Sequence, residues 1–153
     1  MKKSHSKEVV TVDTPWIAVP IRFLRSRTCA SLSVHASKLL LDVLASLQSN
    51  GRGNGDISLT PSLMRKRGWT SRATLNATIH ELVDANLLKP TRQGTRFSTS
   101  LFACTLYPIS CNFNKLDIRQ GNYGTHDYGG QDGSLIKEPT NEAPARWTRV
   151  RGN

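Results

Sequence analysis

Residues 60–86 read TPSLMRKRGWTSRATLNATIHELVDAN, and this stretch decides the fold. Thr60 followed by Pro61 is the pairing of a hydroxyl N-cap with a first-turn proline that begins many helices. The helix runs through Lys66, and Gly68 is the residue type that ends a helix in the left-handed conformation. Only two residues then precede the next helical pattern. The spacing predicts two helices joined by a tight turn, which is a helix-turn-helix.

The second helix of this pair is expected to begin at Thr70 or Ser71. Asn86 ends it, because asparagine is the usual second choice after glycine for the left-handed residue. A core-facing stripe recurs at helical spacing. Its members are Leu75, Ile79, Leu82 and Val83. Measured from that stripe, the side chains that point most directly away from the core are those of Ala73, Ala77, His80 and Asp84.

Upstream, Ser33 and the apolar spacing of residues 34–47 predict a longer helix. Residues 52–56 hold two glycines and can only be a loop, and residues 57–59 leave room for a very short strand. Before the long helix, residues 16–26 predict a lead-in turn of helix that lies on the core through Ile21 and Leu24.

Downstream, residues 87–89 predict a strand, residues 92–95 a turn and residues 97–107 a second strand. The order is therefore helix, short strand, helix, tight turn, helix, strand, turn, strand. This order is typical of a winged helix-turn-helix, an α+β fold with a three-helix core and a β-hairpin wing.

The hydrophobic pattern divides the chain into three parts. Residues 1–15 are polar and basic and predict a flexible arm, and residues 16–117 predict the winged helix-turn-helix domain. Residues 118–153 are rich in glycine and polar side chains, which cannot bury enough apolar area to offset their ordering entropy. They predict a disordered tail.

Charge is the informative part of the composition. The 153 residues hold 21 Lys and Arg against 11 Asp and Glu, a net charge of +10. Residues 61–96 alone carry +5, from seven basic and two acidic side chains. Such an excess is the electrostatic footprint of a polyanion binder, although some basic proteins are merely soluble. No apolar run is long enough for a membrane span or a secretory signal, and three cysteines without a Cys-x-x-Cys pair indicate reduced thiols, so a cytoplasmic protein is expected.

The helix after the tight turn is expected to enter the major groove of double-stranded DNA with its N-terminal end first. Arg72 offers a fork to guanine, and Asn76 can pair with adenine. Ser71 and Thr74 suit a phosphate or a base edge near the free amides of the helix N-terminus. The alternative is an ordinary solvated polar face, but both acids of this helix lie in its C-terminal half.

Further basic side chains flank this helix. Arg65, Lys66 and Arg67 end the preceding helix, where they can contact the DNA backbone or complement the helix dipole. Arg92 and Arg96 bracket the turn of the hairpin, from which a wing reaches a minor groove or phosphates.

Several motifs resemble a largely uncharacterised family of small winged helix-turn-helix proteins from proteobacterial prophages and plasmids. The resemblance covers about residues 16–117. It rests on Phe23-Leu24-x-Ser26, Leu32-Ser33-x-x-Ala36, Asn50-Gly51-Arg52-x-Asn54-Gly55-Asp56, Gly68-Trp69-x-Ser71-x-x-Thr74-Leu75, Glu81-Leu82, Thr91-Arg92-Gln93-Gly94, Leu106-Tyr107-x-Ile109, Cys111 and Lys115-Leu116-Asp117. Two positions depart from the family pattern, Asn86 in place of glycine and Leu106 in place of a Thr-Trp pair. The resemblance implies a DNA-binding fold in a mobile element.

The leading hypothesis is a sequence-specific regulator of transcription of a mobile element. A replication initiator or accessory protein is the second, and a winged helix that binds proteins is the third, with the +5 of residues 61–96 against it. An enzyme is not expected, because the glycine-rich residues 50–56 lack the strand and lysine of a phosphate loop, and no carboxylate cluster or activated nucleophile is present. Histidines and cysteines are not spaced as metal ligands, so no metal or cofactor is expected. Whether the chain acts as a monomer or a homodimer stays open.

Overall fold

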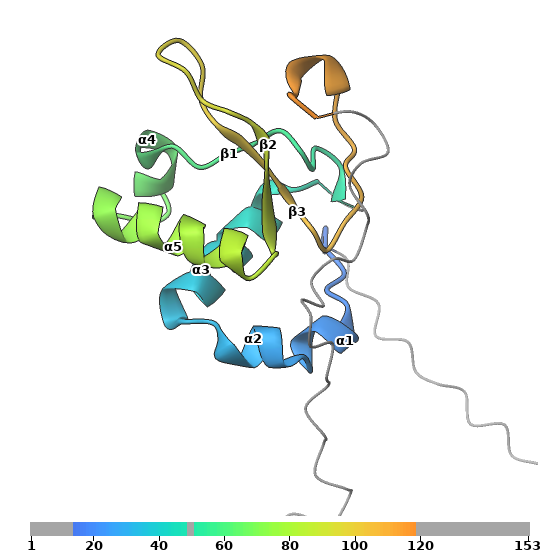
Figure 1. The fold of residues 1–153 in the computed structure, drawn as a ribbon. Helices are drawn as coiled ribbons and strands as arrows, with labels where there is room; N and C mark the ends of the chain where they lie inside the picture. The colour runs from blue at the N-terminus through green and yellow to red at the C-terminus, as the bar shows by residue number, and fades with distance from the viewer. Residues whose placement is uncertain (1–13, 49–50, 119–153) are drawn as a thin grey trace, which may run out of the picture.

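A computed structural model describes residues 14–48 and 51–118 as a mixed α+β structure (Figure 1). The predicted α+β class is thereby confirmed. Nearly all of the predicted arm (residues 1–15) and tail (residues 118–153) lies outside the described residues. Within the described ranges, none of the helices is long and apolar enough to cross a membrane.

The described elements follow one another along the chain as short helices around a small sheet. They are α1 (Ile21–Leu24), α2 (Arg27–Ser31), α3 (Val34–Ser46), β1 (Ile57–Ser58), α4 (Pro61–Arg65), α5 (Arg72–Asp84), β2 (Leu88–Arg92), β3 (Leu101–Cys104) and the 3-10 turn η2 (Phe113–Lys115).

The two longest helices begin where the sequence predicts, and α3 ends at Ser46, one residue before the predicted end. The Ser33 side chain accepts the Ala36 N–H at the start of α3, and the Ser71 side chain accepts the Thr74 N–H at the start of α5. Asn86 has a φ of 55°, which confirms the predicted left-handed end of α5. The helices α3 and α5 pack against each other, and five of their leucines (Leu39, Leu40, Leu44, Leu75 and Leu82) lie in the buried core.

The helix before the tight turn is shorter than predicted. It ends at Arg65 rather than running through Lys66, and tighter i→i+3 bonds continue the chain from there to Gly68. Gly68 has the predicted left-handed φ of 87°, and the Trp69 N–H returns to the Met64 carbonyl. The Gly68 N–H donates to the Arg65 carbonyl. Together with the Trp69 bond, it forms the hydrogen-bond pattern of a glycine-capped helix end. Trp69 itself is buried beneath the turn, as a packing residue.

The strands form an antiparallel sheet in the order β1-β3-β2. The β2–β3 ladder is interrupted by a bulge between Pro90 and Arg92. Pro90 is tolerated because β2 lies at the sheet edge. The predicted strand over residues 97–107 is wrong in its extent, since β3 holds only Leu101–Cys104. Residues 95 and 98 bond to each other across the hairpin tip instead of extending the ladder.

The predicted lead-in helix exists, but its buried residue is not the one expected. Ile21 and Leu24 are both exposed, and Phe23 between them is 1% exposed and lies in the core. The reason is that α1 has a single turn, so only one of its side chains faces inward. The helix α2, capped by Ser26, was not predicted.

The glycine-rich loop before β1 is fixed by one buried asparagine. The Asn54 side chain donates to the carbonyls of Cys104, Tyr107 and Pro108, and it accepts the Cys104 N–H at 2.7 Å. Gly55 has a φ of 108°, and a Cβ there would lie 2.6 Å from the Cys111 sulfur. The loop therefore packs against the chain that follows β3. All three cysteines are free thiols.

Candidate nucleic-acid interface

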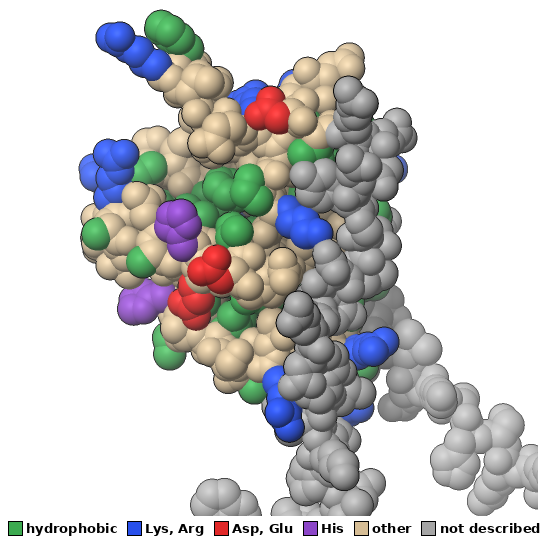
Figure 2. Space-filling model, viewed as in Figure 1, with side chains coloured by type: hydrophobic (Ala, Val, Ile, Leu, Met, Phe, Trp, Pro, Cys, Tyr) green, Lys and Arg blue, Asp and Glu red, His purple; other side chains and the backbone are tan. Residues whose placement is uncertain are grey.

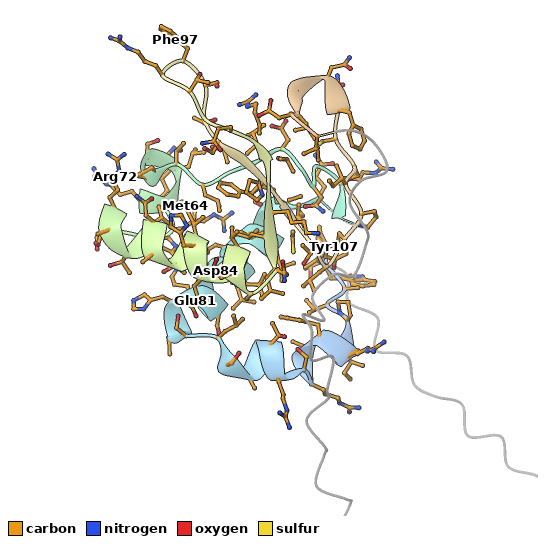
Figure 3. All side chains as sticks on the ribbon, viewed as in Figure 1. Met64, Arg72, Glu81, Asp84, Phe97 and Tyr107 are labelled. Atoms are coloured by element: carbon orange, nitrogen blue, oxygen red, sulfur yellow. The ribbon has the colours of Figure 1, made fainter. Side chains whose placement is uncertain are left out.

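The N-terminal half of α5 presents polar and small side chains to solvent. Arg72, Ala73, Asn76 and Ala77 are exposed there, and His80 and Asp84 continue the same face, so the predicted outward face of this helix is confirmed. Figure 3 places Arg72 at one end of α5 and the two acids toward the other end. The exposed N-terminal half thus carries a positive side chain and no negative one.

Two predicted site residues, Ser71 and Thr74, help to build the helix start. The Ser71 hydroxyl oxygen accepts the Thr74 N–H at 3.2 Å, which leaves the hydroxyl hydrogen able to donate. The Thr74 carbonyl accepts the Thr78 hydroxyl, and Thr74 is half-buried. Both residues fix the N-terminal turn from which Arg72 projects.

Glu81 is held by another helix and faces α3 rather than free solvent. Its two carboxylate oxygens accept the Ser33 N–H at 2.8 Å and the Ser33 hydroxyl at 2.7 Å. A carboxylate at a helix N-terminus is favoured by the helix dipole. Glu81 therefore joins α5 to α3, and its charge is partly compensated there.

The basic run at the end of α4, residues 65–67, divides into two parts. Arg65, Lys66 and Arg67 are all exposed, but an Arg67 guanidinium nitrogen lies 3.6 Å from an Asp42 oxygen. The same carboxylate accepts Lys38 Nζ at 2.7 Å and the Trp69 indole N–H at 2.7 Å. Arg67 is thus tied to α3, whereas no ion pair engages Arg65 or Lys66 within the described part of the chain.

Asp42 is the acid at the centre of this network. Partial burial raises the pKa of its carboxyl, but the hydrogen bonds from Lys38 and Trp69 and the charges of Lys38 and Arg67 outweigh that effect. The pKa of Asp42 is therefore lowered from its ordinary value. The network holds the turn between α4 and α5 against α3.

The hairpin carries the two other predicted arginines in different roles. Arg92 donates from Nε and from a terminal nitrogen to the Thr99 carbonyl, at 3.2 Å and 2.9 Å, and so braces the hairpin. Arg96 stands exposed at the tip, with no ion pair among the described residues. The Asp117 carboxylate accepts the Gln93 N–H at 2.7 Å and anchors the hairpin from outside.

Phe97 is a candidate functional residue that sequence reasoning missed. The predicted strand over residues 97–107 included it, but its side chain is 94% exposed at the hairpin tip (Figure 3). The signal that was available is the run Gly94-Thr95-Arg96-Phe97-Ser98, whose small and hydroxyl residues favour a turn over a strand.

A groove of about 470 Å³ lies between α5 and the hairpin. Ile79 and Val83 of α5 face Pro90 and Phe102 of the sheet across it. Figure 2 shows a green area of hydrophobic side chains at the centre of this face. Blue basic side chains lie to its left and at the hairpin tip. The groove separates α5, which carries the exposed Arg72, from the hairpin, which carries the exposed Arg96.

Metal binding and thiol chemistry would depend on the His, Cys, Asp and Glu side chains of the described residues. Residues 14–48 and 51–118 contain no cluster of three or more His, Cys, Asp or Glu side chains that could hold a metal ion. Burial raises the pKa of Cys104 to about 11, so this thiol stays protonated at neutral pH.

Comparison of the chain with protein-family models, with curated proteins and with solved structures gives no significant match. The resemblance to prophage and plasmid proteins stays a prediction from the sequence.

Proposed function

We propose that the chain is a winged helix-turn-helix protein that binds double-stranded DNA. In this proposal α4 and α5 form the helix-turn-helix, α3 completes the three-helix core, and the β2–β3 hairpin is the wing. The sheet order β1-β3-β2 supports it, because the short strand before the helix pair adds to the edge of the hairpin. The glycine-ended turn between α4 and α5 supports it as well.

The observation that carries the proposal is the exposed, acid-free N-terminal half of α5. Ala73 and Ala77 leave the helix surface low enough to lie deep in a major groove. Arg72 and Asn76 stand beside them, with the side-chain geometries that pair with guanine and with adenine. The exposed Arg65 and the other basic side chains after α4 lie where they can contact the flanking phosphates.

The proposed role is sequence-specific regulation of transcription in a mobile element, the setting that the resemblance implies. A binding site is therefore expected in the DNA beside the gene of this chain. Protein binding by the same fold is disfavoured, because the exposed N-terminal end of α5 and the tip of the hairpin are basic.

The test begins with selection of duplexes by the full-length chain from a random pool of 30 base pairs. Arg72→Ala should weaken binding to the selected duplex by about 1–3 kcal/mol and flatten its base preference. Arg96→Ala should weaken selected and random duplexes more evenly, because a side chain on the phosphates or in the minor groove discriminates little between sequences. Equal losses on both kinds of DNA for both variants would show that α5 does not read bases.

A further inference from the structure

The tip of the hairpin holds an aromatic side chain away from the body of the protein. Phe97 is 94% exposed, more than any other large hydrophobic residue among those described. The Arg96 guanidinium lies over its ring, 6.0 Å from the ring centroid. Figure 3 shows Phe97 beyond the sheet, on the same side of the view as Arg72.

The tip has a defined shape. The Thr95 N–H donates to the Ser98 carbonyl at 2.8 Å, and the hydroxyls of the same two residues lie 2.9 Å apart. The Phe97 N–H donates to the Thr95 hydroxyl oxygen. Below them, a Cβ at Gly94 would lie 2.6 Å from the Ser100 hydroxyl oxygen, so only glycine fits without a shift. These contacts leave Phe97 at the outer corner of a closed turn.

An exposed phenylalanine makes no contribution to the core, and single exposed apolar residues are common on proteins. What distinguishes Phe97 is its charge environment. The sequence has no acidic residue from 85 to 116, and Arg96 is its immediate neighbour. A basic tip without nearby acidic residues in the sequence suits a polyanion, and the polyanion that the proposed function supplies is DNA.

We propose that Phe97 is a wedge that inserts between base pairs from the minor groove and kinks the duplex, while Arg96 binds in that groove beside it. This inference rests on the proposed function and names how the wing takes part in it. Apolar side chains flanked by basic ones act in this way in minor-groove proteins. Insertion removes the phenyl ring from water, and the preformed turn lowers the ordering cost.

The site of insertion follows from the arrangement of α5 and the hairpin. With α5 in a major groove, a wing on the same side reaches the adjacent minor groove, about half a helical turn or ~5 base pairs away. Pyrimidine–purine steps unstack most easily. Selected duplexes should therefore share such a step at a fixed distance from the bases read by α5.

The test uses the full-length chain and the duplex that it selects from a random pool, labelled at both ends for energy transfer. The wild-type chain should bend this duplex by about 20° or more. Phe97→Ala should abolish most of the bend and weaken binding about tenfold, whereas Phe97→Leu keeps an apolar wedge and should retain most of both. Leu41→Ala, which truncates an exposed leucine of α3, is the matched control and should change neither.

The outcomes separate the wedge from the proposed function. A Phe97→Ala chain that binds and bends like the wild type overturns the wedge and leaves DNA binding intact. A Phe97→Ala chain whose only change is loss of self-association, measured by light scattering, shows that the tip meets protein, and it too overturns the wedge. A wild-type chain that selects no duplex overturns both proposals.

Discussion

Salt is the perturbation that tests the electrostatic part of the proposed function most directly. Each phosphate that a basic side chain neutralises releases counterions, so log K falls against log salt with a slope of about −0.9 per contact. The structure limits the number of contacts. Arg65, Lys66, Arg72 and Arg96 are exposed without an ion pair among the described residues, and Arg67 shares its charge with Asp42.

Four contacts predict a slope of about −3.6 and five a slope of about −4.5. Between 50 and 200 mM salt these slopes lower the affinity by about 150-fold and about 500-fold. Fluorescence anisotropy of a labelled duplex across this range measures the slope. An affinity that barely changes over the range refutes the electrostatic reasoning.

Single charge variants refine the same measurement. Arg72→Ala should reduce the magnitude of the slope by about 0.9, because one contact is lost. Arg22→Ala removes the same charge from α1, which lies away from α5 and the hairpin in Figure 1, and should leave the slope unchanged. If both variants change the slope equally, net charge rather than the proposed interface governs binding.

Three further predictions concern stability. Asn54→Ala should lower the free energy of unfolding by about 2–5 kcal/mol in urea, because it removes the Asn54 oxygen that accepts the buried Cys104 N–H and leaves the Cys104 carbonyl only its bond from the Tyr107 N–H. The exposed Asn114→Ala should change it by less than about 0.5 kcal/mol. The pKa of Asp42 is lowered in the folded state, so its contribution to stability is fully present above about pH 5 and is lost as the pH falls through the folded pKa. Asp42→Asn should therefore reduce the loss of unfolding free energy between pH 5 and lower pH, and an unchanged loss would contradict the network. Glu81→Ala should cost about 1 kcal/mol by thermal unfolding, since the α3 N-terminus loses two hydrogen bonds; no loss would mean that the contact contributes nothing.

The two longest helices, α3 and α5, could be predicted from the sequence because their signals are local. Ser33 and Ser71 each lie three residues before the N–H that they cap, and Asn86 and Gly68 end helices through their own backbone conformation. A helix whose core-facing residues recur over three turns leaves little choice of face.

The hairpin could not be predicted to the same degree. Residues 97–107 alternate well enough for a strand, but the ladder ends at Leu101, where the Thr95 and Ser98 bonds replace it. The partners that shape this region are distant in sequence, such as the Gly55 carbonyl that accepts the Thr91 hydroxyl. The alternation of side chains along a strand carries no information about where such distant contacts interrupt it.

In the candidate site, the sequence predicts which residue types are present but not which of them are held by internal hydrogen bonds. Sequence reasoning selected residues by chemical type, and by type Arg92 and Arg96 are equal; the structure makes Arg92 a brace of the hairpin and leaves Arg96 exposed at its tip. Ser71 and Arg72 form a similar pair, because Ser71 caps the helix turn from which the exposed Arg72 projects. The hairpin and the start of α5 thus each combine one side chain fixed by internal bonds with one that is exposed to a ligand. The fixed residue lowers the ordering cost of the free one, which is what a preformed binding surface requires.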